Sequence, residues 1–233
     1  MKQLIECVPN FSEGRDAGKV REIAQAIVSA SDVFELDISM DADHNRSVIT
    51  FAGSIEGAGE AALRGAGRAA ELIDLNAHRG IHPRIGAADV VPFVPLTGSS
   101  LEDCVRIARW VAAEAWRRFR IPAYLYEAAA LRPDRQDLAC IRRGQFERLR
   151  EAIRDDPDRK PDIGEAQLHP TAGAIAVGAR KALIACNFNL DTGNLETARI
   201  IARHIRASSG GLPCVKAMGL HLESKRQAQV SVN

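Results

Sequence analysis

A short loop holds the densest group of chemically capable residues in the chain. From His78 to Arg84 the sequence reads His-Arg-Gly-Ile-His-Pro-Arg. Histidine gains and loses a proton near neutral pH, and arginine donates paired hydrogen bonds to anions. Gly80 and Pro83 restrict the path of the backbone. The loop therefore suits acid–base chemistry on an anionic substrate. The alternative is a surface turn in which His82 caps a helix or a carbonyl, and the loop alone does not decide.

Two further polar segments carry candidate groups. The first runs from Asp41 to Arg46 and contains Asp43, His44 and Asn45. It offers an orienting carboxylate and an anion-binding arginine, although Asp and Asn are also common in solvated turns. The second runs from His169 to Gly173, ahead of Arg180. Its small residues allow a flat ring to approach the backbone. The alternative interpretation is that this segment is only a linker and the start of a strand.

The sequence predicts no metal site. His78 and His82 lie four residues apart, a spacing that suits a metal on a helix, but Gly80 and Pro83 disfavour a helix there. No third ligand is near them, and the five cysteines include no Cys-x-x-Cys pair. Cysteines in apolar runs behave as small core residues.

A glycine-rich segment, 57–67, superficially matches a dinucleotide-binding motif. Its glycines fall inside a predicted helix rather than at the turn before it, and no acidic residue ends a strand about 20 residues on. We expect instead that these glycines let the helix lie close to a sheet.

Composition limits the class of protein. The 233 residues are 46% hydrophobic and 26% charged, as in globular proteins. Thirty-one basic residues face 30 acidic ones, so the basic excess typical of nucleic-acid or membrane-surface binding is missing. No apolar run reaches about 18 residues, and the N-terminus does not resemble a signal peptide. These features predict a cytoplasmic protein.

The loop from His78 to Arg84 must be positioned by the elements around it. Apolar patterns predict strands over 3–8, 33–38, 47–51, 88–96 and 121–126, with a turn at 9–14. They predict helices near 20–28, over 54–75 and after Ser99, whose spacing from Glu102 indicates a capping box. Residues 144–155 form a charged, solvated helix. The order fits a ferredoxin-like βαββαβ pattern, with the loop entering the strand at 88–96.

The remaining residues predict a second, shorter unit. A strand at 182–190, a helix at 195–205 and strands at 215–222 and 228–232 give only strand-helix-strand-strand. The proline-containing loop 156–170 is a candidate boundary. We therefore predict an α+β fold, an α/β two-layer sandwich with mixed sheets. Its ferredoxin-like subdomains span 1–180 and 181–233, and the second is incomplete.

Six segments in order along the chain resemble the formiminotransferase family. They are Glu6–Gly14, Asp43–Val48, His82–Val90, Tyr124–Tyr126, His169–Arg180 and Gln227–Ser231. The resemblance covers nearly the whole chain. It implies two α/β subdomains whose sheets face each other with folate between them. Chains of the family continue past the residue that matches Asn233, so the resemblance also implies that the second subdomain is cut short here.

The resemblance also implies a reaction. Members of the family transfer the formimino group of N-formimino-L-glutamate to N5 of tetrahydrofolate in histidine catabolism, with tetrahydrofolate as co-substrate and no metal. The catalytic histidine falls on His82, which Asp43 or Asp37 would orient. The residues expected to bind folate or substrate are Asp43, Asn45, Arg46, Arg84, Gly164, Glu165, His169, Pro170, Thr171, Ala172 and Gly173.

Two other functions fit the same resemblance. One is a folate-salvage enzyme that passes the formyl group of 5-formyltetrahydrofolate to glutamate. The other is an inactive folate-binding remnant. In each case the expected partners are small molecules, not nucleic acid or membrane, and relatives of this kind suggest a homodimer.

Overall fold

The structure is a computed structural model that describes residues 3–233. The chain divides into two compact units. The first ends at Lys181 and the second begins at Ala182. The first unit contains the strands β1 (Leu4–Cys7), β2 (Asn10–Phe11), β3 (Val33–Asp41), β4 (Arg46–Ser54), β5 (Ala88–Pro95), β6 (Ala123–Glu127) and β7 (Ile175–Ala179). Its helices are α1 (Ala17–Val28), α2 (Ile55–Leu72), α3 (Leu101–Phe119), α4 (Leu138–Arg142) and α5 (Gln145–Ala152). The α+β fold expected from the sequence is confirmed.

The strands β1 and β2 together fill one position in the sheet, between β4 and β5. The break between them falls at Val8 and Pro9, where proline cannot donate a hydrogen bond to a neighbouring strand. The sequence predicted only a turn at 9–14. That prediction is wrong for Asn10 and Phe11, because the proline interrupts the strand without ending it. Both residues rejoin the sheet and are buried.

The first four strand positions form the ferredoxin-like pattern that the sequence predicted. Their order across the sheet is β3, β4, β1 with β2, and then β5, and all these pairs are antiparallel. Beyond β5 the sheet continues with β7 and β6, which pair in parallel and make the sheet mixed. The parallel strands β5, β6 and β7 are almost wholly buried, as expected for strands covered on both faces.

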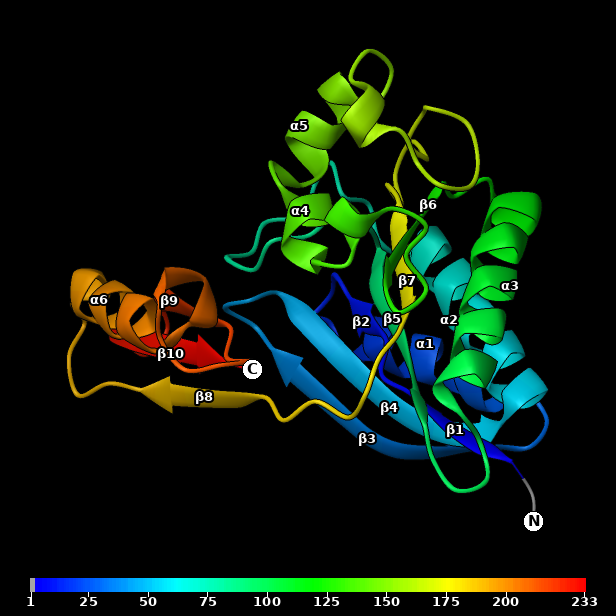
Figure 1. The fold of residues 1–233 in the computed structure, drawn as a ribbon, viewed down its shortest axis with the longest axis horizontal. Coiled ribbons are helices and arrows are strands. Elements are labelled where there is room, and N and C mark those ends of the chain that lie inside the picture. Colours follow the sequence, from blue (N-terminus) through cyan, green and yellow to red (C-terminus); the bar gives the residue numbers. More distant parts are fainter. Residues whose placement is uncertain (1–2) are drawn as a thin grey trace. The chain divides into compact units, whose positions relative to one another are not determined.

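Three helices cover one face of this sheet. Figure 1 shows α1, α2 and α3 side by side, with α2 between the other two. Close packing depends on glycines of α2: an added Cβ at Gly59 would collide with Ile107 of α3, and one at Gly65 would collide with Ile27 of α1. The sequence placed these glycines against a sheet. They serve mainly for contact between helices, although Gly65 also comes close to Phe11 of β2 in the sheet.

The start of α3 differs by one residue from the prediction. Ser100, not Ser99, caps the helix, and Asp103 rather than Glu102 completes the capping box. The hydroxyl of Ser99 donates instead to the carbonyl of Leu4 at 2.6 Å and so ties the loop to β1. A serine pair followed by two acidic residues offers both registers to a pattern search, and tertiary contact selects one.

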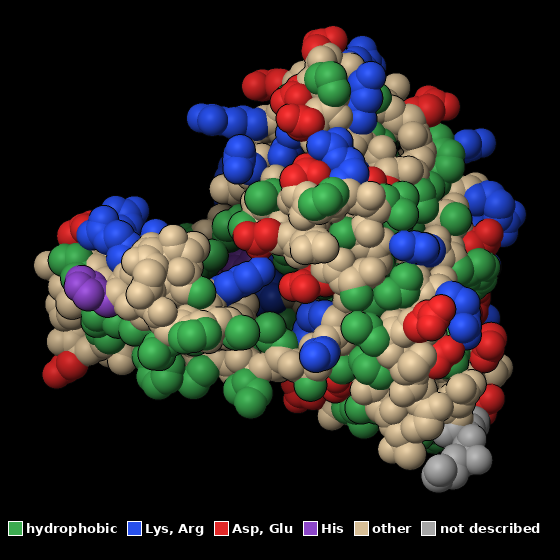
Figure 2. Space-filling view, viewed as in Figure 1, with side chains coloured by type: hydrophobic (Ala, Val, Ile, Leu, Met, Phe, Trp, Pro, Cys, Tyr) green, Lys and Arg blue, Asp and Glu red, His purple; other side chains and the backbone are tan. Residues whose placement is uncertain are grey.

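The proline-containing loop 156–170 is not a boundary, contrary to one of our expectations. Arg135 and Asp162 form a buried ion pair at 2.5 Å, and the amide of Leu125 donates to the Asp162 carboxylate at 2.8 Å. The chain then enters β7 in the interior of the sheet. The prolines therefore mark a long loop within the first unit. The charged helix predicted nearby is confirmed as α5, which buries Phe146 and Leu149 and exposes its charges; charged side chains of both signs gather over this part of the surface in Figure 2.

The second unit contains β8 (Cys186–Asn189), α6 (Leu195–Ile205), β9 (Ala217–Leu222) and β10 (Gln227–Val232). Its strand order, β8-β10-β9, repeats that of β1, β4 and β3 in the first unit. The predicted strand-helix-strand-strand sequence is confirmed. A small core lies between α6 and the sheet, made of Ala198, Ala202, Ala228 and Val230.

Two of the five cysteines, Cys7 and Cys104, are buried as expected for core residues, whereas Cys186 and Cys214 are exposed. Across residues 3–233, none of the helices is long and apolar enough to pass through a lipid bilayer.

Candidate active site

The predicted catalytic loop lines a small pocket in the first unit, which we call the His82 pocket. Its walls come from β2, from the turn between β3 and β4, from the loop before β5, and from β5 itself. The lining residues are Asn10, Phe11, Ser12, His44, Asn45, Arg46, His78, His82, Arg84 and Asp89. Its empty volume, part of which is open to solvent, is about 190 Å³. The pocket therefore has room for reacting groups rather than for a whole folate.

Two glycines let the three segments approach each other. A Cβ at Gly14 would overlap with the carbonyl oxygen of Asp41, and one at Gly80 would overlap with that of His44. Because only glycine lacks this atom, the backbones of β2, the β3–β4 turn and the catalytic loop can pack in direct contact. The separate polar segments of the sequence are thus brought to one place.

Asn45 fastens these segments together. Its backbone is left-handed, with φ 48°, a conformation that Asn tolerates better than most residues. The side-chain oxygen accepts from the amide of Gly14 at 3.0 Å, and the side-chain nitrogen donates to the carbonyl of Arg79 at 2.9 Å. We expected Asn45 to bind substrate. Its amide makes contacts that hold the pocket together, and a role in binding substrate stays a prediction.

His82 presents a nitrogen that can accept a proton. Nδ1 lies 2.9 Å from the carbonyl oxygen of Pro83, and because a carbonyl only accepts, Nδ1 carries the hydrogen and Nε2 carries the lone pair. Burial, followed by the positive charges of Arg46 and Arg142, lowers the pKa of His82 to about 2. His82 is therefore neutral at ordinary pH, and the lone pair of Nε2 is unused within the protein, while the lowered pKa makes it a weaker base than an ordinary imidazole.

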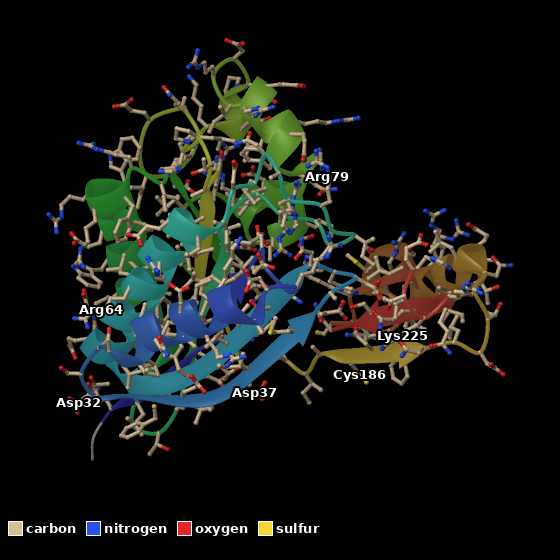
Figure 3. The ribbon with its side chains drawn as sticks, turned by 180° about the vertical axis from the view of Figure 1, so that it is seen from behind. Asp32, Asp37, Arg64, Arg79, Cys186 and Lys225 are labelled. Carbon is tan, nitrogen blue, oxygen red and sulfur yellow. The ribbon has the colours of Figure 1, made fainter. Side chains whose placement is uncertain are left out.

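The orienting group of His82 is a main-chain carbonyl, whereas the sequence suggested the carboxylate of Asp43 or Asp37. Asp37 lies in the middle of β3 with an exposed side chain, well away from Arg79 in the catalytic loop, as Figure 3 shows. Asp43 lies in the β3–β4 turn, where its carbonyl accepts from the amide of Ile81 at 3.3 Å. Asp43 thus supports the loop through its backbone.

His78 and Arg84 form a structural pair. Nε2 of His78 donates to the carbonyl of Asn45 at 2.9 Å, so Nδ1 is left to accept from Nε of Arg84 at 3.1 Å. Burial lowers the pKa of His78, which keeps it neutral for this double role. Both ring nitrogens are used within the protein.

Arg84 is engaged within the protein, and its expected role in binding substrate stays a prediction. Its guanidinium binds both carboxylate oxygens of Glu147, at 2.9 and 2.7 Å, and also the side chain of Gln145. The hydrogen bond from Arg84 lowers the pKa of Glu147 to about 2. A guanidinium that is already satisfied by a carboxylate of α5 is not a free anion donor. Arg84 therefore anchors α5 to the pocket, a contact that sequence spacing could not reveal.

Arg46 is the arginine that keeps an unused donor in the pocket. Its Nη2 donates to the side-chain oxygen of Asn10, while its Nε is buried without a hydrogen-bond partner within residues 3–233. Burial and the nearby charge of Arg142 lower the pKa of Arg46 to about 10, so it remains a cation at neutral pH. The expected anion-binding role of Arg46 is compatible with this geometry.

Asp89 and Arg142 are functional candidates that the sequence did not single out. One oxygen of Asp89 accepts from the amide of Ile85 at 2.7 Å, and the other pairs with Arg142. Asp89 is 2% exposed. It follows the catalytic loop directly, so its place in the sequence offered a signal. Arg142 ends the five-residue helix α4, which is too short to show a periodic pattern.

The segment expected to bind folate divides into two parts. The turn from His169 to Gly173 lies beside the catalytic loop, because the amide of Ala87 donates to the carbonyl of Ala172 at 2.9 Å and the carbonyl of Thr171 accepts from Leu75. Nδ1 of His169 closes this turn by accepting from the amide of Ala172 at 3.0 Å.

The other part lies elsewhere. Gly164 and Glu165 are exposed, and Gly164 adopts φ +100°, where a Cβ would come within 2.8 Å of Trp116 in α3. In the turn from His169 to Gly173, Pro170 is exposed, and its carbonyl accepts a hydrogen bond from the side chain of Asn76 at 3.0 Å. No residue of 164–173 lines the His82 pocket, so folate binding by this segment stays a prediction.

Residues 3–233 contain no group of three or more His, Cys, Asp or Glu side chains placed to hold a metal ion. The His82 pocket brings a neutral histidine beside cationic side chains, an arrangement that suits proton transfer.

Comparison with known proteins identifies the family. Residues 4–180 match the model of the formiminotransferase domain, N-terminal subdomain. The glutamate formimidoyltransferase of Thermoplasma acidophilum is 51% identical over 232 residues, which cover 99% of this chain and 76% of that protein. The protein of the same name from Streptococcus pyogenes is 46% identical, over 100% of this chain and 78% of its own length. The formimidoyltransferase-cyclodeaminase of Mus musculus is 41% identical, with 100% and 44% covered. This chain, whose His82 pocket lies within the matching subdomain, therefore belongs to the formiminotransferase family.

Proposed function

We propose that the chain transfers the formimino group of N-formimino-L-glutamate to N5 of tetrahydrofolate, and that His82 carries the proton. The observation that supports this most is the position of His82 in the pocket, with Nδ1 bonded to a carbonyl and the lone pair of Nε2 unused beside the cationic side chain of Arg46. Relatives named glutamate formimidoyltransferase supply the reaction class. Tetrahydrofolate is a co-substrate in this proposal, and no metal takes part.

In the proposed reaction, N5 of the folate attacks the formimino carbon and must lose its proton. Nε2 of His82 accepts that proton because its lone pair is unused in the free protein. A positioned histidine contributes about 10²–10⁴-fold to such a step. The product forms when the bond between the formimino carbon and the glutamate nitrogen breaks and that nitrogen gains a proton.

Binding follows from the charges around the pocket. Formiminoglutamate carries two carboxylates, and Arg46 offers a buried donor, Nε, that has no partner within residues 3–233. A guanidinium that meets a carboxylate fixes its orientation as well as its position. The pocket is too small for the whole folate. The rest of the folate would then extend along the surface, where the turn from His169 to Gly173 adjoins the loop.

The titration of His82 gives a test that needs no substrate. Since burial and nearby cations lower its pKa to about 2, the ring should stay neutral from pH 8 to pH 4, whereas an ordinary histidine titrates near 6.5. In an NMR titration the ring proton signals of His82 should not shift over this range. Assignment comes from a His82→Gln variant. A midpoint between pH 6 and 7 for His82 would contradict the proposed environment.

The lowered pKa of His82 also fixes the direction in which folding stability changes with pH. Between pH 6.5 and 2 the unfolded chain protonates this histidine and the folded chain does not, so the folded state loses stability as the pH falls. The His82→Gln variant should show a weaker fall over the same range.

A donor comparison tests the proposed reaction itself. The full chain is incubated with tetrahydrofolate and formiminoglutamate, and in parallel with 5-formyltetrahydrofolate and glutamate. We expect turnover in the first mixture to exceed that in the second. Faster turnover in the second mixture would favour the folate-salvage reaction, and folate binding without turnover in either would indicate an inactive binding protein.

A further inference from the structure

His44 has a buried nitrogen that the fold leaves without a partner. The residue is 5% exposed and lines the His82 pocket, and its Nε2 makes no hydrogen bond within residues 3–233. A buried polar atom without a partner destabilises the folded state, and such atoms are uncommon in folded proteins. Stable folding alone therefore does not account for this histidine.

The position of His44 is fixed beside the catalytic base. Its ring stacks on that of His82 with centroids 5.8 Å apart and planes inclined by 27°. Its backbone amide is held by the carboxylate of Asp41 at 2.8 Å, and the close approach of Gly80 to its carbonyl holds the other side. Two imidazoles thus share one small pocket.

We propose that His44 is a second catalytic residue, which donates a proton from Nε2 to the departing glutamate nitrogen while Nε2 of His82 takes the proton from N5 of the folate. The inference rests on the proposed function, and it divides between two histidines the two proton transfers that one would otherwise perform in turn.

Elimination among the pocket residues supports this assignment. The other nitrogens and hydroxyls that could donate are engaged: His78 uses both ring nitrogens, and Ser12 donates to the carbonyl of Gly86 at 2.7 Å. The side-chain nitrogen of Asn10 donates to the carbonyl of Val8 at 2.8 Å. Arg46 keeps a free Nε, but a guanidinium holds its proton too strongly to act as an acid at neutral pH. His44 is the remaining group that can release one.

The protons and electrons balance. The N5 lone pair forms the new bond to the formimino carbon, and the C=N π pair moves onto the imino nitrogen. That pair then reforms the double bond as the bond from carbon to the glutamate nitrogen breaks, and the departing nitrogen takes the proton of the His44 imidazolium. His82 ends with the proton that N5 lost. Return of one proton from His82 to His44, directly or through water, restores the starting state.

The electrostatics of the pocket agree with such a pair. Positive charge on His44 lowers the pKa of His82, after the larger effects of burial, Arg46 and Arg142. Two imidazoles this close disfavour double protonation, because a proton on one ring repels a proton on the other. A single shared proton is what an acid and a base in the same step require.

Paired variants separate a chemical role from a packing role. His44→Phe keeps a flat ring to stack on His82 but has no nitrogen, whereas His44→Gln keeps an N–H donor close to the position of Nε2. His204→Phe, in the second unit, is the matched control, because His204 is exposed. With formiminoglutamate as donor, we expect kcat of His44→Phe to fall about 10²-fold with KM within about threefold. The kcat of His44→Gln should fall less than that of His44→Phe, and the kcat of the His204→Phe control should equal that of the wild type. Circular dichroism and thermal unfolding check that each variant folds.

A second donor tests which proton His44 supplies. In a donor with an arylamine leaving group, the departing nitrogen is less basic and needs less help from an acid. The deficit of His44→Phe should shrink to below about fivefold with this donor, while that of a His82 variant should persist.

The outcomes are distinguishable. If folded His44→Phe keeps kcat within threefold of the wild type, or shows the same deficit with both donors, the role of His44 is wrong while the proposed function stands. If the wild type shows no formimino transfer, the proposed function fails and this inference fails with it.

Discussion

Replacing His82 by glutamine is expected to lower kcat for formimino transfer by about 10²–10⁴-fold. Glutamine fills similar space but loses the contact from Nδ1 to the carbonyl of Pro83, which holds the native ring at 2.9 Å. It has no basic nitrogen, so the proton of N5 has no acceptor in the pocket. The loss should appear mainly in kcat, because the cationic side chains that would hold the substrate are unchanged.

The same variant should fold normally. His82 lies at the edge of the pocket and packs against His44 rather than in the main core. The free energy of unfolding of the His82→Gln protein should therefore stay within about 1 kcal/mol of that of the wild type. Steady-state kinetics and urea unfolding, each beside His204→Gln as control, measure both quantities. A folded His82→Gln protein with kcat within threefold of the wild type would remove His82 from the mechanism.

Replacing Asp89 by alanine is expected to have the largest effect on stability, a loss of about 3–5 kcal/mol. The carboxylate is 4% exposed in its side chain and pairs with Arg142, and its other oxygen accepts from the amide of Ile85. Alanine leaves a cation and an amide without partners in the interior. Since Ile85 directly follows the catalytic loop, transfer activity should also fall.

Two variants calibrate this loss in urea unfolding. Asp89→Asn keeps an oxygen for the amide of Ile85, so it should be less damaging than alanine. Asp134→Ala removes a carboxylate that is 51% exposed and pairs with Arg132 at the surface, which should cost at most about 1 kcal/mol. If Asp89→Ala is no more destabilised than Asp134→Ala, the pair with Arg142 does not support the pocket.

Much of the fold was accessible from the sequence because its signals are local. Regular apolar spacing located α1, an alanine-rich run located α2, and short strand-like runs indicated β3 and β4. The interruption at Pro9 was visible, but not that Asn10 and Phe11 return to the sheet. That outcome depends on partners far along the chain, such as Val48, and no local pattern contains it.

The candidate site was predicted only in part, because local patterns do not show which distant residues pack together. His82 and Arg46 were singled out by residue type and by resemblance, and both line the pocket. Arg84 has the right chemistry for an anion, but its pairing with Glu147 depends on where α5 packs. Arg142 was missed because α4 has only five residues. His44 lay within a predicted segment, yet its unpartnered nitrogen becomes visible only when the three segments are packed together.

The most direct test follows the transferred carbon. Formiminoglutamate labelled with ¹³C in the formimino group is mixed with tetrahydrofolate, and carbon NMR records the label in the presence of the wild type or His82→Gln. The wild type should move the label to N5 of the folate and release glutamate in equal amount, while the variant should leave it on the donor over the same time. A label that stays on glutamate with the wild-type protein, or that moves equally well with His82→Gln, would contradict formimino transfer through His82.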